Sequence, residues 1–166
     1  MEFQRLLNQI EISHLLRFSP QCPIEFYWSD HSMQEKVINL LENVLSNHPI
    51  DRDRVYITGL SMGGYGTWSI AAKRPDLFAA AIPICGGGDP SLAKHLKDLP
   101  IWVFHGLKDK VVLPEESVQM VNAIKKLDGK IKLTLYPDAH HDSWTQTYTN
   151  KEIYNWLLSN KRKNNP

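Results

Sequence analysis

Apolar residues along the chain fall into two alternating patterns. Short continuous runs at 55–58, 79–85, 100–106 and 131–136 are typical of strands buried on both faces. The stretches between them carry apolar residues at helical spacing. This alternation predicts an α/β fold: a mostly parallel sheet of about five strands with helices on both faces. The fifth strand is expected at Leu15 to Phe18.

Helix signals divide the rest of the chain. Ser32 and Glu35 form a capping-box pattern before a first amphipathic helix, whose predicted apolar face comprises Met33, Val37, Leu40, Leu41, Val44 and Leu45. A weaker pattern indicates a short helix over residues 3–12, and residues 20–31 are expected to be a loop.

Three more helices are predicted further along the chain. One should run from Gly63 to about Lys73, where Pro75 stops it. Another should open at Pro114 and carry Val118, Val121, Ile124 and Leu127. A capping box of Thr149 and Glu152 predicts a last helix, partly buried through Ile153, Trp156, Leu157 and Leu158.

Composition narrows the class of protein. With 166 residues, 42% of them hydrophobic, the chain is expected to form a single domain over 1–166, ending in a flexible tail at 160–166. A net charge of +1 gives no reason to expect a nucleic-acid partner. No apolar run reaches the length of a membrane span and no signal peptide is apparent, so we expect a soluble, cytoplasmic protein. Cys22 and Cys85 lack metal-site spacing and are expected in the core.

The stretch Gly59-Leu60-Ser61-Met62-Gly63 is the strongest chemical signal. A strand precedes it and a helix follows, which is the context of a nucleophile elbow. Ser61 is the predicted nucleophile. We expect a Cβ at either flanking glycine to clash with neighbouring chain. The N–H of Met62, at the start of a helix, is the predicted oxyanion donor.

A serine hydroxyl needs a histidine base and a carboxylate that orients it. In open parallel sheets such groups collect beyond the carboxyl ends of strands, and in this chain order the acid precedes the histidine. Asp109 follows the strand ending at Gly106 and is the predicted acid. His140 and His141 follow the strand ending at Tyr136, and local reasoning leaves both open as the base.

Other ionisable residues are given lesser roles. His105 precedes Asp109, which is the wrong order for a base, and is expected to hydrogen-bond within its loop. Asp138 and Asp142 lie beside the histidine pair, but no second cluster of ligands accompanies them, so we expect no metal and no cofactor. His14, His31, His48 and His95 lie outside the strand-end loops and are assigned nothing.

These segments resemble the α/β-hydrolase superfamily, and within it the phospholipase/carboxylesterase group related to dienelactone hydrolases. The resemblance covers roughly residues 16–158 and rests on Ser19-Pro20-Gln21-Cys22-Pro23, the elbow through Trp68, Pro83 to Gly88, Val103 to Gly106 with Asp109, and His141-Asp142-Ser143-Trp144. In that group the histidine before Asp-Ser-Trp is the base. The resemblance therefore implies a triad of Ser61, Asp109 and His141.

The resemblance departs at the N-terminal side. Relatives carry three more strands and a His-Gly-Gly-like loop before the Pro-Gln-Cys-Pro segment, and that loop supplies the second oxyanion donor. Its absence here is expected to lower turnover about 100- to 1,000-fold. A strand would also be missing beside the elbow strand, so either the strand expected at Leu15 to Phe18 pairs there or the edge stays open. An open edge there would favour a homo-oligomer.

The sequence thus favours a serine carboxylic-ester hydrolase that acts on a small-molecule ester through an acyl-enzyme. Tyr65 and Trp144 are candidate walls of the substrate pocket. Two alternatives stay open. One is a peptidase of the prolyl-oligopeptidase kind, which shares the triad order, and the other is a shortened, catalytically weak hydrolase-like domain.

Overall fold

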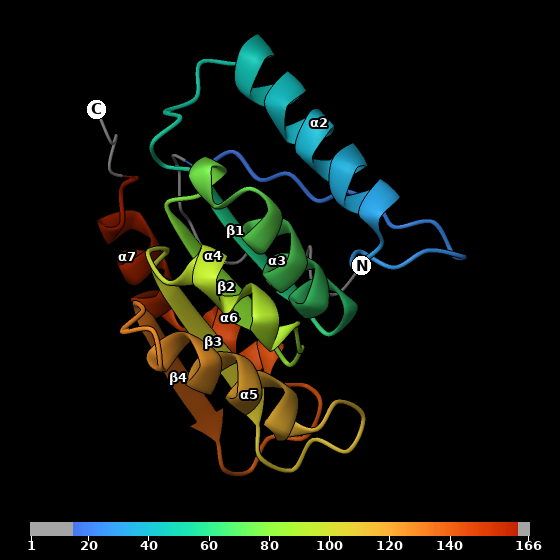
Figure 1. The fold of residues 1–166 in the computed structure, drawn as a ribbon, viewed down its shortest axis with the longest axis vertical. Coiled ribbons are helices and arrows are strands. Elements are labelled where there is room, and N and C mark those ends of the chain that lie inside the picture. The colour runs from blue at the N-terminus through green and yellow to red at the C-terminus, as the bar shows by residue number, and fades with distance from the viewer. Residues whose placement is uncertain (1–14, 163–166) are drawn as a thin grey trace.

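A four-stranded parallel sheet forms the centre of the computed structural model, which describes residues 15–162 (Figure 1). The strands lie side by side in chain order: β1 Tyr56–Leu60, β2 Ala80–Ile84, β3 Ile101–Gly106 and β4 Ile131–Tyr136. All three neighbouring pairs are parallel. Because the strands run the same way, their carboxyl ends meet at one edge of the sheet.

Helices connect and cover the strands. The α-helices are α2 His31–Asn47, α3 Met62–Lys73, α4 Ala93–Leu96, α5 Pro114–Lys125, α6 Trp144–Thr149 and α7 Lys151–Ser159, with short 3-10 turns at Pro75–Leu77 and Pro90–Leu92. Helices α3, α4 and α5 lie in front of the sheet in Figure 1, and α6 and α7 lie behind it. This arrangement confirms the predicted α/β class with both faces covered.

The two faces of the sheet belong to two hydrophobic clusters. One contains Trp68 of α3, Ile124 of α5 and Ala81 and Ile101 of the strands. The other contains Phe104 of β3 and residues of α6 and α7, among them Tyr148, Ile153 and Leu157. Successive strand residues point to opposite faces, so a continuous apolar run supplies both clusters.

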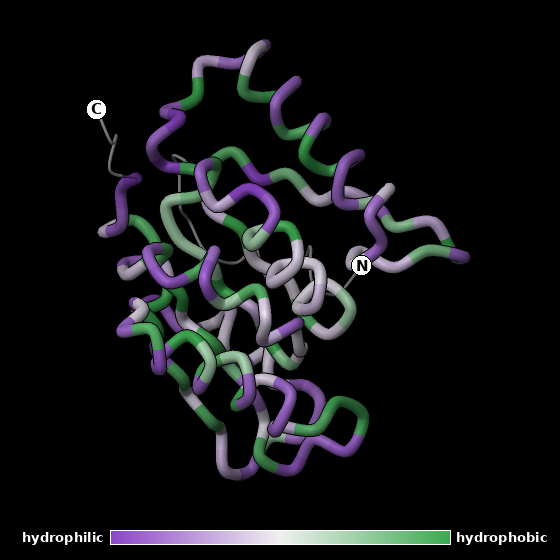
Figure 2. Tube along the Cα trace, in the orientation of Figure 1, coloured by the Kyte–Doolittle hydropathy of each residue, from purple (hydrophilic) through white to green (hydrophobic). Residues whose placement is uncertain are grey.

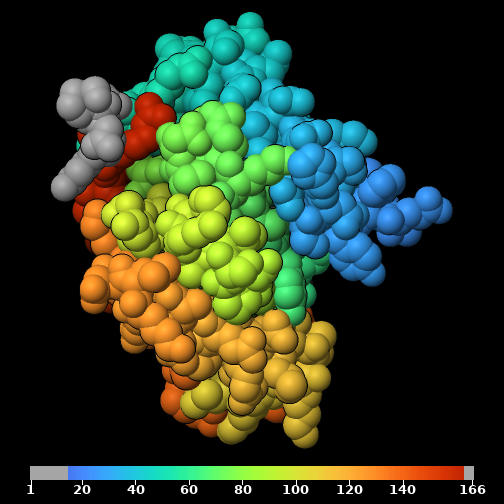
Figure 3. All heavy atoms as spheres, viewed as in Figure 1, coloured from blue at the N-terminus to red at the C-terminus, as the bar shows by residue number. Residues whose placement is uncertain are grey.

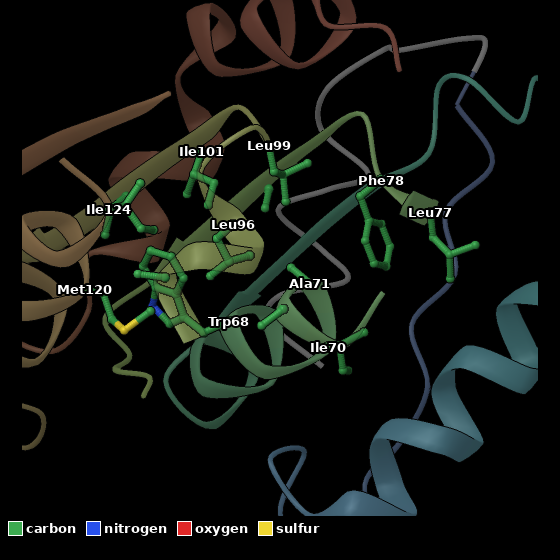
Figure 4. Packing of buried hydrophobic residues seen from close by; sticks show 14 of the residues in the cluster. Trp68, Ile70, Ala71, Leu77, Phe78, Leu96, Leu99, Ile101, Met120 and Ile124 are labelled. Carbon is green, nitrogen blue, oxygen red and sulfur yellow. The ribbon is translucent and has the colours of Figure 1, made fainter. Parts of the chain in front are cut away.

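Figure 4 shows how the first cluster is packed. Trp68 lies among side chains from two other helices, with Met120 and Ile124 of α5 on one side and Leu96 of α4 nearby. Trp68 is 2% exposed and donates its indole N–H to the Gly86 carbonyl at 3.3 Å. The tryptophan therefore anchors α3 both to the core and to the loop after β2.

Helix α2 begins differently from the prediction. Asp30 is its N-cap residue, no side chain caps the helix, and Ser32 lies inside the first turn. The Asp30 carboxylate instead accepts from the Tyr27 N–H at 2.8 Å, which closes the preceding turn. The outer face of α2 is hydrophilic along much of the helix (Figure 2). Leu40, predicted to face inward, is exposed, and Ile38 is buried in its place.

The predicted strand at Leu15 to Phe18 is also wrong, because these residues have no regular secondary structure. In Figure 3 residues 15–30 form a lobe beside α2. The sheet therefore has four strands within residues 15–162 instead of about five. There β1 pairs only with β2, so its other edge carries no partner strand from the described chain. The helix predicted over 3–12 lies outside the described residues.

The C-terminal helix has its boundary one residue later than predicted. Asn150 is the N-cap of α7, and its side chain accepts from the Glu152 N–H at 2.9 Å, whereas Thr149 ends α6. Part of the expected flexible tail is bonded to the body. Arg162 donates to the Asp53 carboxylate at 3.1 Å and its backbone N–H to the Asp53 carbonyl at 2.8 Å. The single-domain assignment stays a prediction.

The turn from β1 into α3 forces an unusual backbone at Ser61. Its φ of 51° lies in the left-handed region, which non-glycine residues seldom adopt, and such strain costs about 1–3 kcal/mol. The Ser61 N–H donates to the Ile84 carbonyl at 3.0 Å, and its own carbonyl accepts from the N–H groups of Gly64 and Tyr65. These bonds hold the serine at the end of the strand with its conformation fixed.

The two glycines around Ser61 are not equivalent, which corrects the expectation for one of them. A Cβ at Gly59 would overlap the backbone carbonyl of Gly63, but a Cβ at Gly63 would meet no heavy atom within 4 Å beyond its own helix backbone. Of these two glycines, only Gly59 is therefore required by close approach.

Phe104→Ala should destabilise the protein by about 3–5 kcal/mol, because Phe104 is 1% exposed and truncation leaves a cavity between the sheet and α7. Urea unfolding monitored by circular dichroism measures the loss. Leu40→Ala, at a site 42% exposed, is the control and should change the free energy of unfolding by about 0.5 kcal/mol or less. Equal losses in the two variants would contradict the packing described for β3.

Gly59→Ala and Gly63→Ala should differ in sign. The first should cost about 1–3 kcal/mol or more, because backbone atoms of the elbow must shift to admit the methyl group. The second should be neutral or stabilise by up to about 1 kcal/mol, since alanine restricts the unfolded chain and fits the helix. Thermal unfolding of both variants beside the parent tests the asymmetry, which equal destabilisation would refute.

Candidate active site

Three loops at the carboxyl edge of the sheet bring together the residues predicted from the sequence. Ser61 directly follows β1, Asp109 lies three positions after β3, and His141 lies five positions after β4. The segments are far apart in the chain, and only parallel pairing of the strands places their ends at the same edge.

The three side chains form a continuous hydrogen-bonded chain. Ser61 Oγ lies 2.9 Å from His141 Nε2, and His141 Nδ1 lies 2.7 Å from Asp109 Oδ2. An ionised carboxylate can only accept, so Nδ1 carries the proton donated to Asp109. In the neutral ring Nε2 is then the acceptor, and the Ser61 hydroxyl donates to it.

Asp109 is held by more than the histidine. Its side chain has no exposed surface, and Oδ1 accepts from the N–H groups of Val111 at 2.8 Å and Val112 at 3.1 Å. Burial alone would raise the pKa of Asp109, but the hydrogen bonds from His141, Val111 and Val112 outweigh it and hold the pKa below its ordinary value. The carboxylate is therefore ionised near neutral pH.

Backbone contacts join the Asp109 loop to the His141 loop. Leu107 donates its N–H to the Tyr136 carbonyl, and Lys108 donates to the Ala139 carbonyl, both at 2.9 Å. The Lys108 ammonium also pairs with Asp138 at 2.6 Å. Because both loops are bonded to each other, the spacing between Asp109 and His141 is set by the backbone as well as by their own hydrogen bond.

The two neighbouring histidines point in different directions. His140 is exposed and its Nδ1 lies 3.1 Å from the Lys108 carbonyl, whereas His141 is 21% exposed and faces Ser61. Trp144, predicted as a pocket wall, packs edge-on against the His141 ring with centroids 5.4 Å apart. This contact restricts rotation of the ring.

Tyr65 is the predicted pocket residue that lines a cavity. The cavity, about 270 Å³, lies between α3, the glycine loop 86–88 and α5, and Trp68 and Met120 form part of its apolar wall. Burial and the negative charge of Glu116 raise the pKa of Tyr65. Its hydroxyl therefore stays protonated near neutral pH. The other polar residues that line the cavity are Ser29, Gln34, Ser69 and Asp89.

Met62 is placed as predicted for an oxyanion donor. It is the first residue of α3, and the first N–H groups of a helix have no acceptor within the helix. The positive end of the helix dipole adds to the attraction for negative charge at this point.

Cys85 lies directly after β2, next to the elbow. Its thiol is therefore a second candidate nucleophile besides Ser61. It is fully buried with a φ of 40°, and burial raises the pKa of its thiol to about 11. At pH 7 only about one thiol in 10⁴ would be ionised. Cys85 and Cys22 are both buried free thiols, as expected of core residues.

The sequence analysis missed a second contact to the acid. His105, the penultimate residue of β3, lies with Nε2 3.2 Å from Asp109 Oδ2. Its ring was expected only to hydrogen-bond within the loop, and it does contact the Val112 carbonyl at 2.9 Å. The available signal was its position four residues before Asp109.

Two features are absent from residues 15–162. No helix there is both long and apolar enough to cross a bilayer. Nor do three or more histidine, cysteine, aspartate or glutamate side chains come together in an arrangement that could hold a metal ion.

Known proteins resemble this chain in both structure and sequence. The structure superimposes on that of a thermostable esterase with a TM-score of 0.83 and 42% identity, covering 86% of this chain and 43% of the esterase. A Salmonella typhimurium protein provisionally named a carboxymethylenebutenolidase is 37% identical over 102 residues, 55% of this chain and 37% of its own length.

A third relative matches a shorter stretch more strongly. Poly(3-hydroxyalkanoate) depolymerase C of Paucimonas lemoignei is 52% identical over 48 residues, which are 29% of this chain and 12% of that protein. The chain thus spans less than half the length of each of these relatives.

The family comparison covers most of the chain. The model of the dienelactone hydrolase family matches residues 26–155, which include the elbow and both later loops of the site. This chain belongs to the dienelactone hydrolase family, within the α/β-hydrolase superfamily.

Proposed function

We propose that the chain hydrolyses carboxylic esters, with Ser61 as nucleophile, His141 as general base and Asp109 as the carboxylate that orients the base. The observation that carries the proposal is the unbroken hydrogen-bonded chain from Ser61 Oγ through the His141 ring to Asp109. Membership of a family whose relatives include an esterase supports the same reaction class.

The proton positions support a defined first step. As Ser61 Oγ attacks the ester carbonyl carbon, its proton passes to His141 Nε2. The imidazolium that forms is stabilised by the buried, ionised Asp109. The tetrahedral intermediate then collapses, the C–O bond to the alcohol breaks, and His141 protonates the leaving alkoxide.

Deacylation reverses these roles. Water enters beside His141, which removes a proton as the oxygen attacks the acyl carbon on Ser61. The bond to Ser61 Oγ breaks, the serine recovers its proton from His141, and the carboxylic acid leaves.

The Met62 N–H is the proposed donor to the oxyanion in both steps, supported by its position at the start of α3. A site that relies on this donor alone would turn over about 10²- to 10³-fold more slowly than one with two donors. The proposed substrate is a small-molecule ester, and the cavity beside Tyr65 is a candidate for one of its substituents.

Ser61→Ala and His141→Ala should each lower kcat/KM for p-nitrophenyl acetate by roughly 10³-fold or more, because either change breaks the proton path. His140→Ala is the matched control: it removes the neighbouring imidazole, which points to the Lys108 carbonyl, and should cost a few-fold at most. Release of p-nitrophenol measured spectrophotometrically gives all four rates.

Equal rates for the parent chain and Ser61→Ala would reject the proposed reaction and favour a catalytically weak hydrolase-like domain. A similar loss in His140→Ala and His141→Ala would reject the assignment of the base. Faster cleavage of a p-nitroanilide than of the ester would point instead to a peptidase.

Ionisation of Asp109 should make the free energy of unfolding depend on pH under acidic conditions. Because the folded-state pKa of Asp109 lies below its unfolded value, its ionisation stabilises the fold above the ordinary aspartate range. That contribution is lost as pH falls through the folded pKa. The stability advantage of the parent over Asp109→Asn should therefore shrink as the pH falls from about 5 to 3.5, the range in which the carboxylate takes up its proton.

Urea titrations of both proteins at several pH values between 7 and 3.5 give this difference directly. A gap that stays constant, or widens, on acidification would show that ionised Asp109 does not stabilise the native state.

A further inference from the structure

A second histidine is buried against the carboxylate of the site. His105 has no exposed surface, and its Nε2 lies 3.2 Å from Asp109 Oδ2 and 2.9 Å from the Val112 carbonyl. On the other side of the ring, Nδ1 lies 2.8 Å from Ser117 Oγ of α5. His105 therefore bridges the Asp109 loop and the helix that follows it.

The neighbours of His105 determine where one of its protons must be. A carbonyl and a carboxylate can only accept, so Nε2 must carry a hydrogen, which it donates to the Val112 carbonyl while the Asp109 carboxylate lies 3.2 Å from the same nitrogen. Ser117 can donate to Nδ1, or accept from it while donating to the Gly86 carbonyl at 2.9 Å. Either arrangement leaves the Nε2–H donor in place.

Two imidazole nitrogens consequently face Asp109 Oδ2, of which His141 Nδ1 forms the hydrogen bond and His105 Nε2 makes a close contact. His141 Nδ1 lies 2.7 Å away and His105 Nε2 lies 3.2 Å away, while Oδ1 is occupied by the Val111 and Val112 N–H groups. With donors on both oxygens, the carboxylate has one preferred orientation. At 3.2 Å the positive end of the His105 Nε2–H dipole also stabilises negative charge on the oxygen that faces His141.

We propose that His105 is a positioning residue for the reaction. It fixes the Asp109 oxygen against which His141 is aligned, and it limits how strongly that oxygen holds the proton of the imidazolium. The proposal rests on the triad proposed above. His105 acts through Asp109 and does not itself exchange a proton with substrate.

Other ionisable groups near Asp109 do not account for such an effect. The charge of Asp109 acts on Tyr65 of α3 and on Cys85 after β2, but burial raises the pKa of both, so both are neutral near pH 7. Glu116 of α5 faces Tyr65, and Asp142 faces Cys85. None of these four groups is altered by a change at His105.

Two amide substitutions separate positioning from packing. In His105→Gln the side-chain amide reaches the position of Nε2, so it can still donate to the Val112 carbonyl and keep an N–H beside Asp109. In His105→Asn the amide is one methylene shorter, so it can bond Ser117 at the position of Nδ1 but leaves Asp109 without this N–H. Both variants bury a similar polar group, and circular dichroism checks that both fold.

We expect His105→Gln to stay within a few-fold of the parent in kcat/KM for p-nitrophenyl acetate. His105→Asn should lose about 10- to 100-fold, the range typical when a residue that orients a reacting group is removed. The acid limb of its kcat/KM profile should move to higher pH, because the carboxylate then holds the imidazolium proton more strongly.

The same displacement should appear in an NMR titration of the His141 ring, which requires no turnover. This readout distinguishes failure of the proposal from failure of the proposed function, because the ring titrates whether or not the ester is cleaved. Identical titration midpoints in parent, Gln and Asn proteins, or a shift to lower pH in His105→Asn, would overturn the role of His105. Equal rate losses in His105→Gln and His105→Asn, with the acid limb of the kcat/KM profile unchanged, would also overturn the proposal. They would show that His105 contributes only to packing.

Discussion

The site depends on the strained backbone of Ser61. A residue with φ of 51° has to be held from both sides, and here the strand before it and the helix after it do so through the Ile84 carbonyl and the N–H groups of Gly64 and Tyr65. The cost of the strain is met by the packing of α3, anchored by Trp68, on the sheet. The result is a hydroxyl whose direction is set by the fold.

The remaining groups are positioned by backbone contacts between loops. Hydrogen bonds from Leu107 and Lys108 to the loop after β4 fix the distance across which Asp109 and His141 meet. Packing of Trp144 on the His141 ring and donors on both oxygens of Asp109 then restrict the side chains. Catalytic geometry of this kind needs supporting contacts outside the reacting groups, because each side chain would otherwise occupy several rotamers.

Elements with continuous apolar runs were predicted closely, since burial on both faces leaves a strong signal. The four strands and helices α3 and α5 lie within one or two residues of their predicted positions. Predictions failed where a single hydrogen bond decides the outcome. Asp30 and Asn150 replace the expected capping residues Ser32 and Thr149, and Leu15 to Phe18 lack the partner that would make them a strand.

The sequence by itself determined the fold class and the three loops that carry the site. Hydrophobic periodicity depends only on residues close together in the chain, and the order of strands and helices follows directly from it. Local reasoning could not choose between His140 and His141, nor foresee that His105 contacts Asp109. Those choices depend on which way adjacent side chains point once two loops are bonded together. Only the tertiary structure decides that, because it brings together side chains whose contact does not follow from their positions in the sequence.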